Sequence, residues 1–282
     1  MTKITLFYDR VRWEEKQLHD RASQKGIQLD FLDVRELLYP IPREGRAMGT
    51  VLQRCVSHSR GIRAARYFEA EGTKVINSSK TSELCSDKFA TGLRLQEAGI
   101  PHPKTIMTLS IESALKAAER LGYPVVMKPL SGSWGREVAV LSDERSLKSY
   151  LELKEGSESP EDHVYYLQEF VRNPGRDIRS VCVGGEIVAC IYRYAPEGEW
   201  RSNVALGGIA KPCHLDAADR ELVIRGAEVV GGEVVGVDSM ESPHGLVIHE
   251  VNSNVEFRGA AGGTGVDIAG KILDYAVGRS TK

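Results

Sequence analysis

The residues best suited to chemistry are three oxygen-bearing side chains near the C-terminal end, Asp238, Glu250 and Asn252. All three stand within apolar segments, where a carboxylate without a partner would be costly. Carboxylate and amide oxygens are hard ligands that suit Mg²⁺, which in such sites usually also binds substrate phosphates. The sequence therefore predicts a Mg²⁺ site at these residues. The alternative is a pair of solvated acids on an edge hairpin.

A β-hairpin must position these ligands. Residues 234–242 and 246–252 are rich in β-branched side chains and flank a Pro-His-Gly turn, a pattern typical of two paired strands. A three-residue loop would place Asp238 opposite Glu250. Because side chains alternate along a strand, Glu250 and Asn252 then share a face. Like charges directly opposite each other destabilise a sheet, so we expect a cation between the two acids.

The composition is that of an ordinary globular protein. The chain has 282 residues, 41% hydrophobic and 27% charged, which is enough for two or three compact units. A formal net charge of −2 favours no nucleic-acid partner. The apolar runs are too short to span a membrane, and residues 3–9 predict a strand rather than a signal peptide. Five scattered cysteines without a C-x-x-C motif favour a reducing cytoplasm over disulfides or a zinc site: Cys55, Cys85, Cys182, Cys190 and Cys213.

The N-terminal part of the chain alternates between strands and helices. The predicted strands are 3–9, 27–34, 51–56 and 75–77, and the predicted helices are 14–25 and 62–71. This alternation predicts a small parallel α/β unit. Two further helices are expected, one at 87–98 after an N-capping Ser86 and one from Ser110 to Gly122.

A loop rich in glycine and serine, residues 130–136, separates two predicted strands, 125–129 and 138–141. Glycine lets backbone N–H groups approach phosphate oxygens closely. The loop matches neither the Walker A motif nor G-x-G-x-x-G, and an ordinary hairpin loop has a similar composition. We interpret it as a hinged flap over phosphate, with Lys128 in the strand directly before it.

The remaining strands are predicted at 165–171, 176–183 and 186–193, and a Gly-Gly turn joins the last two. Asp177 and Arg179 share one face of that hairpin, whereas Arg193 falls on the other face in a regular register. A bulge or a sheet edge must re-aim one arginine if both are to reach one ligand. The other expected segments are a loop at 200–208, a helix at 216–231, a glycine-dense loop at 259–265 and a last helix at 266–277.

Together these segments resemble the ATP-grasp superfamily, in order and over nearly the whole chain. The resemblance is carried by Asp87-Lys88, Met127-Lys128-Pro129 with the 131–136 loop, Gln168-Glu169-Phe170-Val171, Arg176-Asp177-Ile178-Arg179, Arg193, Asn203, Asp238 and Glu250-Val251-Asn252. Within the superfamily, residues 54–61, 132–136 and 252–258 are most similar to the amino-group carrier protein ligases of lysine and arginine biosynthesis. These enzymes are relatives of the RimK-type glutamate ligases.

The resemblance implies an α/β protein with an ATP-grasp fold behind an N-terminal parallel α/β domain, divided at 1–87, 88–172 and 173–282. The implied cofactors are ATP and Mg²⁺, with Mg²⁺ on Asp238, Glu250 and Asn252. The implied catalytic residues are Arg179, Arg193 and Lys128. The residues implied to bind nucleotide are Lys88, Lys128, Gly132, Ser133, Trp134, Gly135, Arg136, Gln168, Glu169, Phe170, Val171, Arg179, Arg193 and Asn203.

The implied reaction joins an amino acid to a small acidic carrier protein. ATP phosphorylates the side-chain carboxylate of the carrier's C-terminal glutamate, and the α-amino group of glutamate or 2-aminoadipate attacks the acyl phosphate. The residues expected to hold these substrates are Arg201, Asn203, Val204, Glu256, Phe257, Arg258, Gly259 and Ala260. Aminoadipate-selective members carry Asn followed by Ser or Thr in place of Gly259-Ala260, which favours glutamate here, or both substrates. A cytoplasmic homo-oligomer is expected.

Three other functions fit parts of the pattern. A RimK-like enzyme would add glutamate to another protein or to a small cofactor. A nucleotide-binding regulator without ligase activity would be expected to have an eroded metal site. A sugar- or peptide-binding module would make the set of Lys88, Lys128 and Arg179 a coincidence. The complete set of metal ligands favours catalysis.

Overall fold

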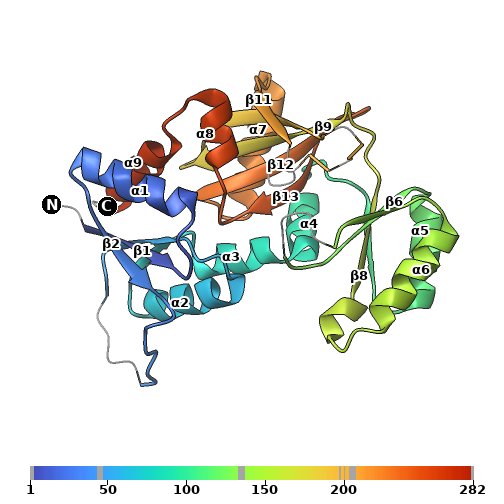
Figure 1. Cartoon of the computed structure of the whole chain (residues 1–282), viewed down its shortest axis with the longest axis horizontal. Coiled ribbons are helices and arrows are strands. Elements are labelled where there is room, and N and C mark those ends of the chain that lie inside the picture. The colour runs from blue at the N-terminus through green and yellow to red at the C-terminus, as the bar shows by residue number, and fades with distance from the viewer. Residues whose placement is uncertain are drawn as a thin grey trace.

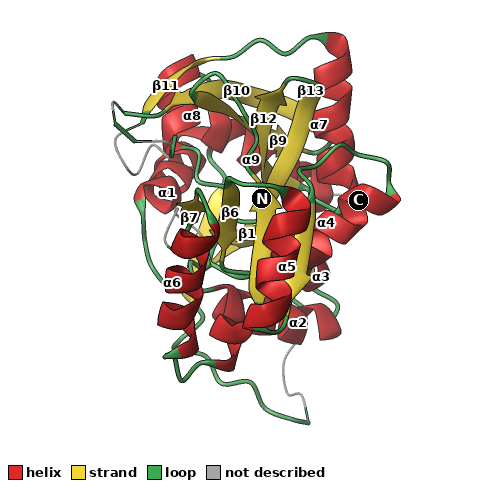
Figure 2. Ribbon diagram, turned by 90° about the vertical axis from the view of Figure 1, so that its right-hand side faces the viewer, coloured by secondary structure: helices red, strands yellow, loops and turns green. Residues whose placement is uncertain are grey.

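The computed structural model describes residues 3–42, 47–132, 137–196, 198–199, 201–202 and 208–280. In this part of the chain the strands form three sheets, one parallel and two antiparallel, and helices pack against them (Figures 1 and 2). None of the described helices is long and apolar enough to cross a membrane. All five cysteines are free, as expected.

The N-terminal sheet is parallel, which confirms the predicted α/β unit. Its strands, in the spatial order β2-β1-β3-β4, are β1 (Lys3–Tyr8), β2 (Gln28–Asp33), β3 (Thr50–Gln53) and β4 (Lys74–Ile76). Helix α1 (Trp13–Lys25) ends at Gly26, whose φ of 65° suits glycine. Helix α2 (His58–Ala70) begins earlier than predicted because the Ser57 side chain caps it by accepting from the backbone N–H of Arg60.

The chain leaves this sheet through two helices that meet at Asp87. Helix α3 (Ser79–Ser86) was not predicted, and α4 (Lys88–Glu97) follows directly. The predicted cap, Ser86, is wrong. The Asp87 side chain instead accepts from the backbone N–H groups of Phe89 and Ala90, at 2.8 and 3.0 Å. Lys88 is therefore the first residue of α4.

The second sheet is antiparallel, in the order β5-β8-β6-β7. Its strands are β5 (Thr105–Thr108), β6 (Val125–Lys128), β7 (Ala139–Leu141) and β8 (Tyr165–Glu169). Helix α5 (Ile111–Leu121) was predicted. Helix α6 (Glu144–Glu155) and the short 3₁₀ helix η1 (Pro160–His163) were not. Leu147 and Leu151 of α6 are fully buried with α5 and the sheet, so α6 is part of this unit's core.

The third sheet is antiparallel, in the order β11-β10-β9-β12-β13. Its strands are β9 (Arg176–Val183), β10 (Glu186–Tyr194), β11 (Ile209–Pro212), β12 (Val234–Ser242) and β13 (Gly245–Asn252). Its helices are α7 (Ala217–Val229), α8 (Arg258–Thr264) and α9 (Ile268–Ser280). Strand β11 was not predicted, and the glycine-dense loop expected at 259–265 is wrong because α8 occupies it.

Close packing explains why a glycine-rich segment is helical. A Cβ added to Gly263 would lie 3.2 Å from the Ile191 side chain and 3.4 Å from that of Ala210. Ala260, on the same helix, is 1% exposed. The small residues let α8 lie against β10 and β11, and this burial outweighs the low helix propensity of glycine.

Two bulges set the register of the third sheet. In β12–β13, Ser242 pairs with Gly245, so the loop has two residues rather than the predicted three, and His249 is left as an extra residue. The bulge restores the predicted pair of Asp238 with Glu250, and Gly236 pairs with Asn252. In β9–β10 a register shift between Ile187 and Ala189 brings Arg193 opposite Asp177. This is the bulge that the sequence required to bring Arg193 and Arg179 to one face.

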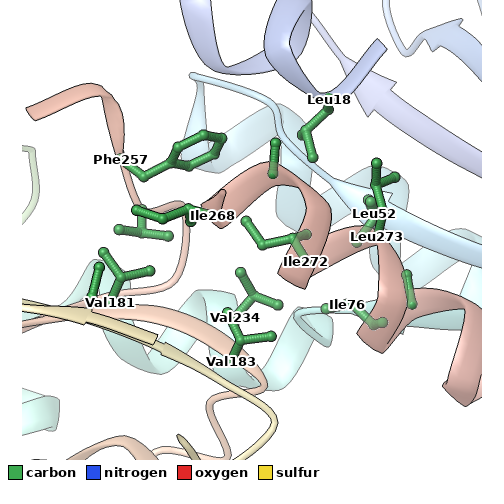
Figure 3. Close-up of a cluster of buried hydrophobic side chains, with 14 of the residues drawn as sticks. Leu18, Leu52, Ile76, Val181, Val183, Val234, Phe257, Ile268, Ile272 and Leu273 are labelled. Atoms are coloured by element: carbon green, nitrogen blue, oxygen red, sulfur yellow. The ribbon is translucent and has the colours of Figure 1, made fainter. Parts of the chain in front are cut away.

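One buried cluster joins the N-terminal and C-terminal sheets (Figure 3). Leu18 of α1 and Leu52 of β3 meet Ile272 and Leu273 of α9 there, and Val234 of β12 lies on the opposite side of α9. The first elements of the chain, β1 and α1, thus lie beside its last helix, α9, as Figure 1 also shows. Residues from distant parts of the sequence are held in fixed positions by this shared core.

Candidate functional site

A cleft of about 1020 Å³ lies where the three sheets meet. Most of the predicted site residues in the described part of the chain line it: Lys88, Lys128, Gly132, Gln168, Glu169, Phe170, Val171, Arg179, Arg193, Arg201, Asp238, Glu250, Asn252, Glu256, Arg258, Gly259 and Ala260. Ser133, Trp134, Gly135, Arg136, Asn203 and Val204 lie outside the described residues. The cleft is therefore the place where the separate sequence motifs converge.

Asp238 is the centre of a buried ionic cluster. Its carboxylate accepts from Nε and Nη2 of Arg179, the latter at 2.7 Å, and Nη2 of Arg193 lies 3.3 Å away. Burial alone would raise the pKa of Asp238, but Arg179 and Arg193 together hold it well below its ordinary range. The carboxylate is therefore ionised at neutral pH, as a metal ligand must be.

Asp177 fixes the second arginine. Nε and Nη2 of Arg193 donate to the two Asp177 oxygens at 2.6 and 2.7 Å, a bidentate pair. Both residues are buried, each with 5% exposure. Burial alone would lower the pKa of Arg193, but Asp238 and Asp177 raise it above its ordinary value. The guanidinium is thus charged and held in one orientation.

Glu250 and Asn252 stand beside Asp238 across the hairpin. Asn252 Nδ2 is 3.4 Å from Asp238 Oδ2, and Lys88 Nζ is 3.7 Å from Glu250 Oε1. Among the described residues, no group of three or more His, Cys, Asp or Glu side chains is arranged to hold a metal. The candidate set therefore depends on one amide oxygen beside two carboxylates. Such hard donors fit Mg²⁺, and a cation between Asp238 and Glu250 would offset their like charges.

Lys128 lies on the opposite wall of the cleft. Its Nζ donates to Gln168 Oε1 at 2.7 Å, and Gln168 in turn donates to the Thr105 hydroxyl at 3.1 Å. Burial lowers the pKa of Lys128 to about 8. Because water solvates the buried Lys128 ammonium poorly, an anion that binds in the cleft would stabilise its charge. The Lys88 ammonium donates to the backbone oxygen of Gly132 at 2.8 Å, so it contacts the start of the predicted flap.

Two histidines reach the cleft without having been predicted as site residues. His58 is the first residue of α2, and burial, followed by the charge of Lys88, lowers its pKa. His249 is the bulged residue of β13, and burial lowers its pKa to about 3. Both imidazoles are therefore neutral at pH 7.

The far end of the cleft is built from α1 and the segment before α8. Arg12 donates to Glu15 at 2.9 Å, to Glu256 at 3.3 Å and to Asn254 Oδ1 at 3.4 Å. Glu14 accepts from the backbone N–H of Arg258 at 3.1 Å. The acidic and basic side chains at this end could contact both the carboxylates and the amino group of an amino acid.

One of the predicted substrate residues needs correction. Phe257 does not line the cleft: it is 1% exposed and stacks edge-on against Trp13 in the shared core. It precedes α8 and points inward because its neighbours Val255 and Ala260 also face that core. Arg201 lines the cleft, but its side chain donates to Glu199 at 3.1 and 2.7 Å.

The sequence interpretation missed Arg12, Glu14, His58, Asp177, His249 and Asn254 as cleft residues. Asp177 had a usable indication, because it was predicted to share a face with Arg179. Residues 54–61, which include His58, were part of the family resemblance, but no function was predicted for them. Arg12 and Glu14 come from a helix whose orientation no local pattern specifies.

Both parts of the chain match the models of known protein families. Residues 4–84 match the LysX preATP-grasp domain, and residues 85–276 match the RimK-like ATP-grasp domain. The second match covers more than half of the chain. The boundary between the two matches falls within the last turn of α3.

Similar proteins span nearly the whole chain. It is 36% identical over 276 residues to the glutamate–LysW ligase ArgX of Sulfurisphaera tokodaii, covering 97% of each chain. It is 37% identical over 260 residues to the alpha-aminoadipate–LysW ligase LysX of the same organism, covering 90% of this chain and 91% of that one.

Among solved structures, a RimK domain ATP-grasp protein from Sphaerobacter thermophilus superimposes with a TM-score of 0.79 at 26% identity, covering 97% of this chain and 98% of that one. The architecture expected from the sequence is confirmed by these comparisons. The chain therefore belongs to the RimK-like ATP-grasp family and is an ATP-dependent ligase with a pre-ATP-grasp domain of the LysX type.

Proposed function

We propose that this ligase joins the α-amino group of glutamate, 2-aminoadipate or both to a small acidic carrier protein. The bond forms at the side-chain carboxylate of the carrier's C-terminal glutamate, through an acyl phosphate. The observation that carries the proposal is near-full-length similarity to two ligases named for the carrier LysW, one also named for glutamate and one for alpha-aminoadipate. The cleft supports it by bringing together acidic and basic side chains from the N-terminal unit, the second sheet and the third sheet.

Asp238, Glu250 and Asn252 would hold Mg²⁺, which would offset the negative charge of the phosphates when bound. Lys128 and Lys88 would bind the phosphates. Gln168 to Val171 would contact the adenine. Lys88 already contacts Gly132, so the flap that follows would close over the phosphates and exclude water, which would otherwise hydrolyse the acyl phosphate.

Arg179 and Arg193 would stabilise the negative charge that develops on the transferred phosphoryl group and on the tetrahedral oxyanion. Both guanidinium groups meet at Asp238, so they lie next to the proposed metal ligands. Asp177 would hold Arg193 in place. Most of the catalysis would thus be positioning and electrostatics, and no nucleophilic side chain is required.

The amino acid would bind at the end of the cleft formed by Glu256, Arg258 and the first turn of α8. Arg258 would pair with a carboxylate. Gly259 and Ala260 have no polar side chain with which to select between substrates that differ by one methylene. A hydrophobic difference of that size is worth only about 1–3 kcal/mol, so we infer use of glutamate or of both amino acids.

The test is an ADP-release assay with the purified carrier, comparing glutamate with 2-aminoadipate, and intact mass of the product. We expect ADP only when carrier and amino acid are both present, with one added residue per carrier. Glu250→Ala should abolish ligation while the protein stays folded, and Lys128→Ala should weaken ATP binding. Glu241→Ala on the same hairpin, outside the cleft lining, is the control.

A different outcome would favour the retained alternative, a ligase that adds glutamate to another protein or to a small cofactor. ADP formation with such an acceptor, and none with the carrier, would replace the carrier proposal. Near-normal ADP release by Glu250→Ala would contradict the metal assignment. We also retain as proposals the boundaries 1–87, 88–172 and 173–282, a homo-oligomer and a cytoplasmic location.

A further inference from the structure

His249 is a polar side chain that the fold leaves without a partner. Both of its ring nitrogens are buried, and neither has a hydrogen-bond partner among the described residues. An imidazole always has at least one N–H donor, and leaving such a group unpaired in a buried position costs stability. The side chain lines the cleft. A ligand in the cleft is therefore a candidate partner.

The bulge explains why His249 faces the cleft. On β13, Leu246, Ile248 and Val251 are buried together in the core beneath α7. In a regular strand, side chains at even-numbered positions face one side of the sheet and those at odd-numbered positions face the other. Leu246, Ile248 and Val251 all face the core, so the strand must contain one extra residue between 248 and 251. The extra residue is His249, which therefore shares the cleft face with Glu250. A strand without a bulge would pair with β12 without His249.

The polar groups around His249 are already paired with others. Lys128 and Gln168 are bonded to each other at 2.7 Å, and Asp238 is bonded to Arg179. Behind the strand lies a cavity of only about 10 Å³, also lined by His249. This is room for one water at most, which makes a trapped water the competing partner. The side chain borders the cleft as well as this small cavity.

We propose that His249 is a nucleotide-binding residue, whose imidazole forms a hydrogen bond with ATP or ADP in the cleft. The proposal rests on the assignment of this cleft to the nucleotide made above. The bulge then has a function: it adds one side chain to the cleft face without moving Asp238 or Glu250 out of register. The unpaired imidazole lowers the stability of the empty enzyme and increases the gain on binding.

The test measures ADP binding by calorimetry in EDTA, so that no metal at the neighbouring Glu250 contributes. In His249→Leu we expect the dissociation constant for ADP to rise about three- to tenfold, as for the loss of one hydrogen bond. We also expect the ADP-free variant to melt no lower than the parent, because a buried unpaired polar group has been removed. A merely structural role predicts a lower melting temperature and unchanged affinity.

Two further variants sharpen the result. His249→Asn keeps a donor and an acceptor and should recover part of the affinity, and it replaces the leucine variant if that one fails to fold. The matched control is His163→Leu: His163 Nε2 is also buried and unpaired, but the residue lies on η1 outside the cleft lining. The control should leave ADP affinity unchanged.

A direct readout is the ¹⁵N resonances of the His249 ring, identified by their absence in His249→Asn, which should shift when ADP is added. Unchanged ADP affinity in His249→Leu, with unshifted ring resonances, overturns this proposal alone when Lys128→Ala still weakens binding. A parent enzyme that does not bind ADP at all overturns the proposed function and this proposal together.

Discussion

Asp177 and Asp238 are two buried carboxylates that share two arginines, Arg179 and Arg193. Their formal charges balance, which explains why four ionised groups tolerate burial next to one another. The arginine that the proposed chemistry needs is thus held by a residue that would not touch the phosphates. Asp177 thus differs from Asp238, Arg179 and Arg193, because its proposed role is to orient another side chain.

We predict that Asp177→Asn lowers kcat at least tenfold and destabilises the fold by about 3 kcal/mol, because Arg193 stays buried with one of its two neighbouring carboxylates neutralised. The control is Glu241→Gln, since Glu241 holds Arg176 in the same bidentate geometry at 2.7 and 2.8 Å but is 34% exposed. That change should cost no more than about 1 kcal/mol. Steady-state ADP release and denaturant unfolding measure both; a normal kcat in Asp177→Asn would contradict the role.

Lys128 gives a pH-dependent prediction. Burial lowers its pKa to about 8 from 10.5, so the free enzyme loses this charge as the pH rises through 8. A bound polyphosphate favours the charged form and raises the pKa again. Nucleotide binding should therefore take up a proton at about pH 8.5 but not at about pH 6.5, where Lys128 is already charged, and affinity should fall as the pH rises.

Calorimetry of ADP binding in buffers of different ionisation enthalpy measures this uptake. Lys128→Met should abolish it, because methionine keeps the chain's bulk without a titrating group. Equal heats in all buffers at the higher pH would show that Lys128 does not change its protonation state on binding.

At the scale of elements, the hairpin β12–β13 is organised around one extra residue. Leu246 and Ile248 face the core before the bulge, and Val251 faces it afterwards. Removing His249 would join Ile248 directly to Glu250 and let the alternation run unbroken from Leu246 to Asn252. The bulge thus accommodates His249 and is not needed to place the metal ligands.

We predict that deletion of His249 yields a folded protein, whereas deletion of Val251 does not. The second deletion would turn Asn252 towards the core and leave its amide buried without a partner. Thermal melting followed by circular dichroism compares the two. An insoluble or unfolded His249 deletion, alongside a folded Val251 deletion, would show that the pairing register depends on the bulge.

For the whole molecule, Asn77 joins the N-terminal unit to the third sheet. Its Nδ2 donates to the backbone oxygens of Val234 and Ser253 at 2.6 and 2.7 Å. Its Oδ1 accepts from the backbone N–H groups of Glu233 and Val234 at 2.8 and 2.9 Å. Asn77 is 2% exposed and stands beside the shared core in which Ile76 is buried. The position of the N-terminal wall of the cleft depends on such contacts.

We predict that Asn77→Ala destabilises the protein by about 3 kcal/mol or more, because four hydrogen bonds to the backbone are lost, three of them buried. For a chain of this size that is a fall in melting temperature of roughly 6–12 °C. Gln28→Ala is the control, since Gln28 is exposed and its side chain donates to that of Asp30. Differential scanning calorimetry measures both variants. A change of less than about 1 kcal/mol in the free energy of unfolding of Asn77→Ala would contradict the role of Asn77 in joining the two units.

Local patterns in the sequence were sufficient for much of this protein. The parallel N-terminal unit and the hairpin strands follow from alternation and turn residues, which act over a few neighbouring positions. The pairing of Asp238 with Glu250 was predicted from a three-residue loop, and it holds because the bulge at His249 compensates for the shorter loop. The need for a bulge before Arg193 could also be inferred, because parity along a strand is a local property. Only tertiary packing decided where the bulges of β10 and β13 lie and which side chains they bring together.

The loop length before β13, the helix α8 and the inward turn of Phe257 all depend on what packs against them. Arg12 and His249 reach the cleft from elements far apart in the chain. Burial of apolar faces selects one register and one helix orientation among several that the local sequence allows. That choice is made by contacts between distant segments, and a short stretch of sequence carries no record of them.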